Sequence, residues 1–177
     1  MVPVSEDIAD QLTITSLGAP SNSCMHYTDL IKQGEGLRKC KYLDTMGIPT
    51  ICYGYNLQNG DARSVVTKAG GDFDDIMNGS GCTTQSVCDN LLNTMIASFV
   101  TAEKQIYGNL SCQYAEDVAV DMTYNLGKAG MSSFHTFISL MQQGKYADAA
   151  ADGYGTAWCG QVGTRCTRDM EQLKNCC

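Results

Sequence analysis

Hydrophobic residues recur at helical spacing along most of the chain. Five segments place them about three and four residues apart, which is the pattern of a helix that buries one face. They are Tyr27, Leu30 and Ile31; Ala62, Val65, Val66 and Ala69; Cys88, Leu91, Leu92, Met95 and Phe99; Ala115, Val118, Ala119 and Met122; and Phe134, Phe137, Ile138 and Met141. These segments predict five helices, and the first of them begins near His26.

Polar and glycine residues mark where these helices should begin and end. Thr84 is placed to cap the third helix, and Ser132 or Ser133 the fifth, because hydroxyl side chains accept hydrogen bonds from a first-turn N–H. Glycines are expected to end the earlier helices, since they adopt backbone angles that other residues avoid. They are Gly34 and Gly36, Gly70 and Gly71, and Gly127.

Residues 40–57 have a different pattern, with isolated apolar and aromatic residues on both sides of a turn sequence. The segment Asp44-Thr45-Met46-Gly47 has Asp first and Gly fourth, which favours a type I turn. We therefore expect a small β-hairpin region here. The fold class is α+β, with a small sheet near the N-terminus and a larger helical body behind it.

The chain divides into an N-terminal extension, residues 1–23, and one domain, residues 24–177. The extension has Pro3, Pro20 and a Ser-Asn-Ser stretch without a clear period. Within the domain we expect a small lobe over about 26–80 and a helical lobe over about 81–177. The first residues lack the basic and apolar regions of a signal peptide, and no stretch is apolar enough to cross a membrane. We expect the mature form of a secreted or lysosome-like protein that does not insert into membranes.

Charge and cysteine content narrow the functional classes. The net charge of −7 argues against a nucleic-acid partner, which requires a basic face. Ten cysteines indicate an oxidising compartment and up to five disulfides. Paired CxxC spacing is absent from the sequence and only two histidines, His26 and His135, are present, so we expect no metal site and no cofactor. Both histidines are expected to be solvated or packed.

The cysteine spacing suggests some pairs without fixing the connectivity. A cysteine nucleophile would need a histidine base, and nothing in the sequence indicates one. The expected pairs are Cys40 with Cys52 across the hairpin, Cys82 with Cys88 around a short loop, and Cys176 and Cys177 each with a different cysteine elsewhere.

Two carboxylates and a threonine form the candidate chemistry. Glu35 lies at a predicted helix end, where the partial negative charge disfavours an ionised carboxylate and suits a proton donor. Asp44 lies on the turn, where N–H donors favour its ionised form, and Thr50 could hold a water molecule. Two carboxyl groups in unlike surroundings are what glycoside hydrolysis uses. The alternative is structural, since Glu beside Gly often ends a helix and Asp often starts a turn.

The same residues closely resemble the signature of bacteriophage-type lysozymes, glycoside hydrolase family 24. The matching run is Glu35-Gly36-Leu37-Arg38-x-x-x-Tyr42-x-Asp44-Thr45-x-Gly47-x-x-Thr50-Ile51-x-Tyr53-Gly54. The resemblance continues through Asn125-Leu126-Gly127 and Trp158 and covers roughly residues 26–170. It implies a lysozyme-like fold in which a long helix joins a small β-containing lobe to a helical lobe, with a cleft between them.

The resemblance also implies roles for individual residues. Glu35 corresponds to the general acid, Asp44 to the second carboxylate and Thr50 to the catalytic threonine of an inverting enzyme. Arg165 corresponds to the partner that holds Glu35 across the cleft. Substrate-binding residues would be Asn56 on the near wall and Tyr124 with Asn125 on the far wall, although the last two could simply end a helix before Gly127.

Some positions depart from the family's pattern. Tyr55 stands where many relatives have histidine, and Cys52 replaces a common glycine. Gly163 and Thr164 replace a more polar and basic pair near Arg165, which affects the expected glycan contacts.

The resemblance predicts a lysozyme, a muramidase that hydrolyses the β-1,4 bond between N-acetylmuramic acid and N-acetylglucosamine in bacterial peptidoglycan. The many cysteines favour a secreted eukaryotic member, such as an invertebrate one, with an antibacterial or digestive role. Two alternatives remain: a non-catalytic peptidoglycan-binding module and a lytic transglycosylase. Asp44 and Thr50 favour hydrolysis over the second, because a transglycosylase does not need to position a water molecule.

Overall fold

The structure, a computed structural model, describes residues 24–177. The N-terminal extension expected over residues 1–23 lies outside the described residues. The elements are α1 (Tyr27–Glu35), β1 (Arg38–Leu43), β2 (Pro49–Cys52), β3 (Tyr55–Asn56), α2 (Ala62–Lys68), α3 (Phe73–Asn78), α4 (Gln85–Tyr107), α5 (Gln113–Met131), α6 (His135–Gln142), α7 (Tyr146–Tyr154), α8 (Ala157–Val162) and α9 (Thr164–Cys176). Within the described part, no helix is long and apolar enough to span a membrane.

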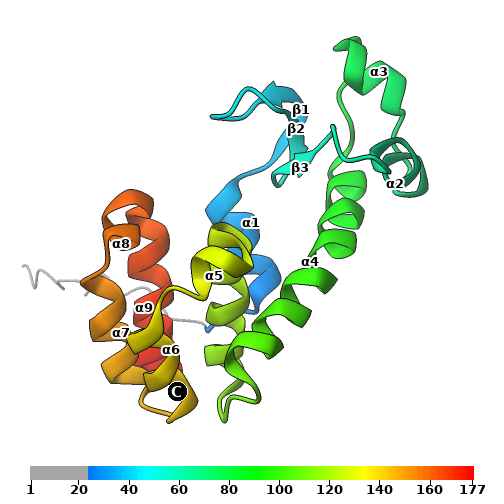
Figure 1. Ribbon diagram of the computed structural model, residues 1–177. Helices are drawn as coiled ribbons and strands as arrows, with labels where there is room; N and C mark the ends of the chain where they lie inside the picture. Colours follow the sequence, from blue (N-terminus) through cyan, green and yellow to red (C-terminus); the bar gives the residue numbers. More distant parts are fainter. Residues whose placement is uncertain (1–23) are drawn as a thin grey trace, which may run out of the picture.

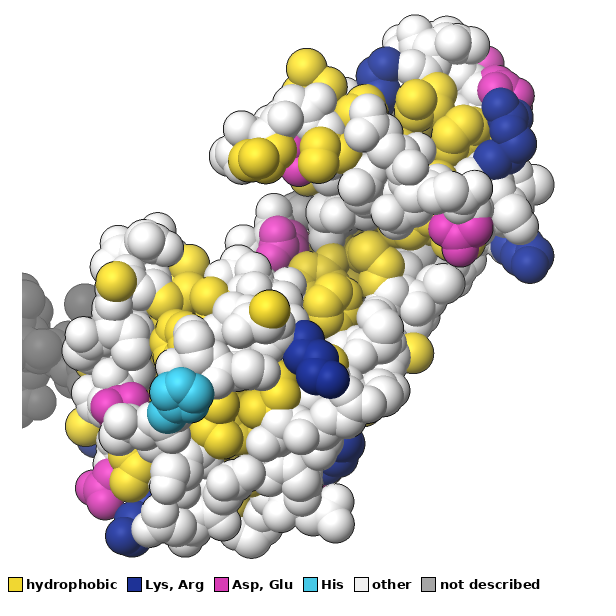
Figure 2. All heavy atoms as spheres, viewed as in Figure 1, with side chains coloured by type: hydrophobic (Ala, Val, Ile, Leu, Met, Phe, Trp, Pro, Cys, Tyr) yellow, Lys and Arg dark blue, Asp and Glu magenta, His cyan; other side chains and the backbone are white. Residues whose placement is uncertain are grey.

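The elements form two lobes joined by the long helix α4 (Figure 1). The sheet, α2 and α3 form the small lobe, and α5–α9 form the larger helical lobe with α1 packed against α5 and α9. Each lobe has its own core, and α1 contributes Leu30 to the larger one and Ile31 to the smaller. The surface is hollowed between the lobes (Figure 2). The expected α+β architecture is confirmed.

The helix boundaries agree with most of the polar signals. The His26 side chain accepts from the Thr28 N–H at the start of α1, and Thr84 caps α4 by accepting from Val87 N at 3.3 Å. The prediction for the fifth helix was wrong: Ser132 and Ser133 bond back to carbonyls of the preceding helix, and α6 begins at His135 without a side-chain cap.

Two further expectations need correction. Gly127 interrupts α5 with φ 70° and ψ 161°, but helical structure resumes beyond it to Met131. Met95 and Phe99 are only half-buried, because the middle of α4 runs between the lobes, where the Phe99 ring packs on Tyr124 with ring centroids 4.8 Å apart. The apolar period correctly places Met95 and Phe99 on the inner side of the helix. It cannot show that the cores of the two lobes are separate at this point of α4.

The three antiparallel strands lie in the order β1-β2-β3. Tyr42 on β1 faces Thr50 on β2, and Thr50 in turn faces Asn56 on β3. The turn from Asp44 to Gly47 closes with a hydrogen bond from Gly47 N to Asp44 O at 3.0 Å, which confirms the predicted hairpin. Gly47 has φ 76°, a conformation that glycine adopts without steric cost.

All ten cysteines are in disulfides, so the expected framework of five is confirmed. Both short-range pairings were wrong: Cys40 bonds Cys82 and Cys52 bonds Cys88. The strand register explains the first error, because Arg38, not Cys40, faces Cys52 and the register shifts between Arg38 and Tyr42. Cys88 lies fully buried in α4, where it bonds Cys52 at the end of β2.

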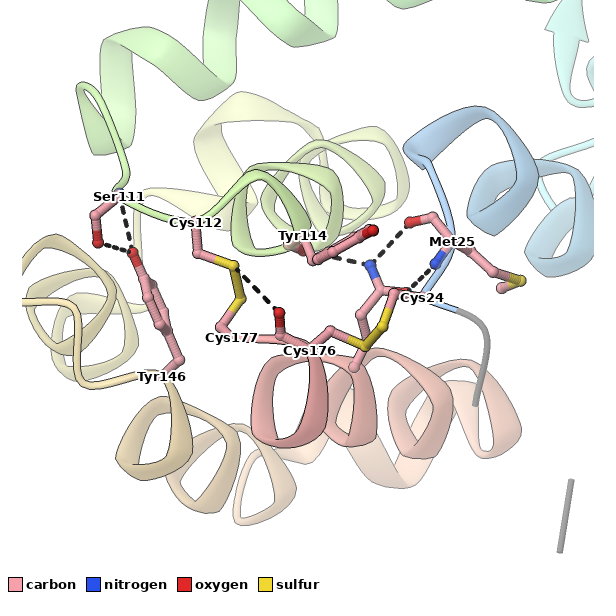
Figure 3. The surroundings of a disulfide bond; sticks show 9 residues. Cys24, Met25, Ser111, Cys112, Tyr114, Tyr146, Cys176 and Cys177 are labelled. Atoms are coloured by element: carbon pink, nitrogen blue, oxygen red, sulfur yellow. Dashed lines mark hydrogen bonds between the residues drawn. A yellow bond between two sulfur atoms is a disulfide. The ribbon is translucent and has the colours of Figure 1, made fainter. Parts of the chain in front are cut away.

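The C-terminal cysteines bond to two distant parts of the chain, as predicted. Cys176 bonds Cys24 just before α1, and Cys177 bonds Cys112 just before α5 (Figure 3). The Gln172 side chain adds hydrogen bonds to both backbone polar groups of Met25. The end of α9 is therefore fastened to the starts of α1 and α5, two of the helices on which it packs.

Candidate active site

Glu35 is the last residue of α1, and the glycines on both sides of it have different tasks. Gly36 ends the helix with φ 70°, where a side chain would be strained. Gly34 leaves room for Arg165, since a Cβ at this position would lie 2.8 Å from the guanidinium carbon. The sequence Gly34-Glu35-Gly36 therefore exposes the carboxyl group and lets an arginine from a distant helix approach it.

Arg165 comes from the first turn of α9 and reaches Glu35 across 130 residues of sequence. Its Nη1 donates to Glu35 Oε1 at 2.7 Å. The Arg165 side chain is 6% exposed and that of Glu35 is 25% exposed. Burial alone would lower the pKa of Arg165, but hydrogen bonds to and the charges of Asp121 and Glu35 raise it, so the guanidinium stays charged.

The other side of Arg165 is occupied by Asp121 of α5, which is fully buried. Arg165 Nε and Nη2 donate to the two carboxylate oxygens of Asp121, each at 2.8 Å. Arg168 Nη2 reaches the same carboxylate at 3.2 Å and also donates to Asp169 Oδ1 at 2.8 Å. Burial first, and the neighbouring Asp121 carboxylate second, raise the pKa of Asp169 well above its ordinary value.

Asp44 and Thr50 lie together on the hairpin. Asp44 Oδ1 accepts from the backbone N–H groups of Met46 and Ile48, both at 2.8 Å. The Ile48 carbonyl accepts from Asp44 N at 3.0 Å and from Thr50 Oγ1 at 2.9 Å. The turn thus fixes the carboxylate through one oxygen, and the hydroxyl hydrogen of Thr50 is already used.

Tyr42 connects the two carboxylates electrostatically. It faces Thr50 in the sheet, and the Arg38 guanidinium lies 4.4 Å from its ring centroid. Burial raises the pKa of Tyr42, Arg38 opposes this, and the negative charges of Glu35 and Asp44 raise it further. Tyr42 therefore lies in the electric field of both Glu35 and Asp44.

Tyr124 of α5 reaches across to the small lobe. Its hydroxyl donates to the backbone carbonyl of Tyr53. A Cβ added to Gly54 would lie 3.8 Å from both Glu35 Oε2 and the Tyr124 hydroxyl, so these groups border the same space. Burial first, and then the negative charge of Glu35, raise the pKa of Tyr124, and the hydroxyl remains protonated.

The two asparagines expected to bind substrate are partly engaged in the protein. Asn56 Oδ1 accepts from Gln58 N at 2.7 Å, which fixes the side chain beside Thr50 on the sheet. Asn125 is exposed, and its Oδ1 accepts from Trp158 Nε1 at 2.8 Å. Trp158 lines a pocket of about 450 Å³ on the helical lobe.

Sequence reasoning missed Gly34, Asp121, Arg168 and Asp169. One signal was available, because Asp121 interrupts the apolar run Val118-Ala119-Val120-Asp121-Met122. Arg165, Arg168 and Asp169 are also three and four residues apart, and so share one face of α9. In residues 24–177, no group of three or more His, Cys, Asp or Glu is arranged to hold a metal ion.

Comparison with known proteins identifies a family for most of the chain. A family model described as phage lysozyme matches residues 32–170, a span that contains Glu35, Asp44, Thr50 and the whole arginine–carboxylate network. A search of curated proteins finds no match.

Proposed function

The chain belongs to the phage lysozyme family, and from this premise we propose that it hydrolyses the β-1,4 bond between N-acetylmuramic acid and N-acetylglucosamine. Family membership implies peptidoglycan hydrolysis in general, whereas the bond, the residues and the mechanism belong to the proposal. The observation that carries it is the contrast between two carboxyl groups. Glu35 is held by one oxygen on an arginine, and Asp44 is held by one oxygen on two backbone N–H groups.

Glu35 takes the role of general acid. Arg165 holds Oε1, so Oε2 is the oxygen that can give its proton to the leaving glycosidic oxygen. Oε2 borders the space over Gly54, which has no side chain to cover this oxygen. A held carboxyl oxygen and an open space beside its partner are the geometry that proton donation to a bound substrate requires.

Asp44 and Thr50 take the role of holding and activating water. Asp44 Oδ1 is occupied by backbone N–H groups, so Oδ2 is available to accept a proton from water. The Thr50 hydroxyl donates to Ile48 O, so its oxygen is left to accept the other water hydrogen. Such a water has a lone pair free to attack the sugar carbon opposite Glu35, which gives inversion of configuration.

Three further residues are proposed to bind the glycan. Among the described residues only the oxygen of the Asn56 side chain is hydrogen-bonded, so its amide nitrogen can donate beside Thr50. Tyr124 and Asn125 lie on the opposite lobe, one bonded to the small lobe's backbone and the other to Trp158. Their fixed side chains would form the two walls of the glycan site.

The five disulfides support a secreted protein that acts outside the cell, because disulfides persist in oxidising compartments. Degradation of bacterial walls by such a protein would serve defence or digestion. A lytic transglycosylase is the nearest alternative, and the water site formed by Asp44 and Thr50 favours hydrolysis over it.

The proposal is tested by measuring the clearing of a bacterial wall suspension by the wild type, Glu35→Gln and Asp44→Asn. Loss of a general acid or base lowers the rate by about 10²–10⁴-fold, and we expect losses of this size. Asp148→Asn, which removes an exposed carboxylate on α7, serves as the matched control and should retain wild-type activity. Equal activity in all four proteins would refute the site, and wall binding without clearing by the wild type would indicate a binding module.

A further inference from the structure

The carboxyl group proposed as the general acid has an unfavourable neighbour. A guanidinium 2.7 Å from Glu35 stabilises its ionised form, whereas an acid must hold a proton until the substrate arrives. An arginine whose charge is partly compensated by another carboxylate would still orient Glu35 but would stabilise its ionised form less. The structure contains a group that can neutralise Arg165.

That group is Asp121. It meets Arg165 with two hydrogen bonds of 2.8 Å, whereas Glu35 makes one. Asp121 is fully buried, and Glu35 is partly exposed, so the Arg165–Asp121 pair is the less screened of the two. A third contact, from Arg165 Nη2 to the Asp121 backbone oxygen at 3.3 Å, fixes the guanidinium plane.

We propose that Asp121 is a positioning residue for the general acid: it fixes Arg165 against Glu35 and compensates the arginine's charge, so that Glu35 is oriented and can still hold a proton. This inference rests on the function proposed above. Asp121 acts through Arg165, and no contact joins its side chain to Glu35 or to the space over Gly54 among the described residues.

Arg168 opposes the effect of Asp121 on Arg165. It contacts the Asp121 carboxylate at 3.2 Å and therefore takes up part of the charge that Asp121 offers to Arg165. Arg168 is itself paired with the buried Asp169 at 2.8 Å. In this network Asp121 lowers the positive charge that acts on Glu35, and Arg168 raises it.

The other titratable groups near Glu35 leave this balance in place. Tyr42 on β1 and Tyr124 on α5 face it, and burial raises the pKa of both, so they stay neutral in the working range. The charge of Asp44 on the hairpin, like that of Glu35, raises the pKa of Tyr42. Asp44 itself accepts a hydrogen bond from the backbone N–H of Met46. Arg38 is turned to the Tyr42 ring at 4.4 Å, so Arg165, with the Asp121 carboxylate bound to it, is the charged group in direct hydrogen-bond contact with Glu35.

The test uses two substitutions with opposite expected signs. Asp121→Asn should move the alkaline limb of the pH–activity profile to lower pH by about one unit, because Arg165 then holds Glu35 ionised. Arg168→Gln should move the same limb to higher pH, because the charge of Asp121 is then fully available to Arg165. A purely structural role would lower activity in both variants without displacing the limb in opposite directions.

Asp117→Asn is the matched control. Asp117 is buried one turn earlier on α5 and accepts from Tyr27 N at 3.1 Å, and in residues 24–177 no hydrogen bond or ion pair joins it to either arginine. It loses the same charge, and its alkaline limb should stay at the wild-type pH. Circular dichroism and thermal unfolding establish that each variant is folded. If Asp121→Asn does not fold, the upward displacement in Arg168→Gln carries the test by itself.

A second readout separates this inference from the proposed function. The titration of the Glu35 side-chain carboxyl carbon, followed by NMR and assigned with Glu35→Gln, needs no activity. Its midpoint should fall in Asp121→Asn and rise in Arg168→Gln. An unmoved midpoint in the folded variants would overturn the inference even if the wild type is active, whereas an inactive wild type with moving midpoints would overturn only the proposed function.

Discussion

Glu103, on the joining helix α4, is a buried carboxyl group outside the active site. Its side chain is fully buried, and neither oxygen has a hydrogen-bond partner among residues 24–177. Lys104 lies 3.8 Å away and favours ionisation, but burial dominates and raises the pKa of Glu103 to about 7. Tyr107, one helical turn further on, also has an unpaired hydroxyl. This part of the helical lobe is therefore sensitive to proton binding.

The free energy of unfolding should therefore fall as the pH rises from about 4.5 to about 7. The folded state holds this proton more tightly than the unfolded state, so the stabilisation is complete below the unfolded pKa of 4.5 and is lost as pH passes the folded value. The difference corresponds to at most about 3 kcal/mol. Urea unfolding across this range should show the slope in the wild type and a weaker one in Glu103→Gln.

Asp148→Asn provides the comparison, because it removes an exposed carboxylate from α7. It should keep the wild-type slope. A Glu103→Gln variant whose stability depends on pH as steeply as that of the wild type would show that another group is responsible.

At the scale of single residues, the sequence predicts the position of those site residues that are placed by local structure. Glu35 and Asp44 are placed by a helix end and a turn, both set within a few residues of chain. Asp121 and Arg168 could not be assigned in this way, because their partners come together only when α5 and α9 pack. The presence of Asp121 in an apolar run indicated a buried polar partner but did not identify it.

At the scale of elements, the junction of α8 and α9 positions Arg165. Gly163 separates the two helices with φ 54°, and Arg165 follows two residues later. The disulfide between Cys159 and Cys166 spans this junction and closes a short loop around it. The bond therefore restrains the arginine that contacts Glu35.

Removing this disulfide should affect activity more than stability, in contrast to removing the one between Cys112 and Cys177. Loop-closure entropy gives about 2 kcal/mol for the short loop, with a sequence separation of 7, and about 4 kcal/mol for the longer one, with a separation of 65. Double Cys→Ser variants of each pair should be compared by thermal unfolding and by wall clearing at a temperature where both are folded.

We expect the variant lacking Cys159–Cys166 to be the more stable and the less active of the two. The reverse order of activities would show that the junction does not need the bond to hold Arg165. The comparison has an internal control, since each variant loses two cysteines near α9.

Element-scale prediction succeeds for helices with strong periods and fails for pairings that depend on packing. Thr84 caps α4 as expected because the cap is local. The pattern predicts a cross-strand bond between Cys40 and Cys52, but the register shift in β1 places Arg38 opposite Cys52. A shift of this kind alters the facing of every later residue, and nothing in the local sequence marks it.

At the scale of the whole molecule, the net charge of −7 opposes binding to anionic bacterial walls. The basic strand β1 partly offsets this beside Glu35, with Arg38 and Lys39 exposed and Lys41 bonded to the Met77 carbonyl. The long-range repulsion is screened by salt, whereas contacts inside the cleft are screened much less.

Wall clearing should therefore survive a rise in ionic strength from about 0.05 to about 0.5 M, where the screening length shortens to a few ångströms. The rate can be followed by turbidity at each salt concentration, with Lys39→Gln as a probe of the basic strand. A collapse of activity with salt, reproduced at low salt by Lys39→Gln, would show that the strand's charge supplies the binding.

The overall architecture was the most predictable part of the molecule, because the α+β class follows from helical periods placed after one hairpin and the family resemblance implies two lobes with a joining helix. The relation between the lobes was not predictable from these periods. It depends on contacts such as the one from Tyr124 to the Tyr53 backbone, which joins residues 71 positions apart.

The central claim is that Glu35 and Asp44 cleave the glycan by adding water. It is tested most directly by digesting purified peptidoglycan in ¹⁸O-labelled water and analysing the products by mass spectrometry. The wild type should produce muramic acid reducing ends that carry one ¹⁸O atom, and Glu35→Gln and Asp44→Asn should produce almost none. Anhydromuramic ends without ¹⁸O, or equal labelling by all three proteins, would contradict the account.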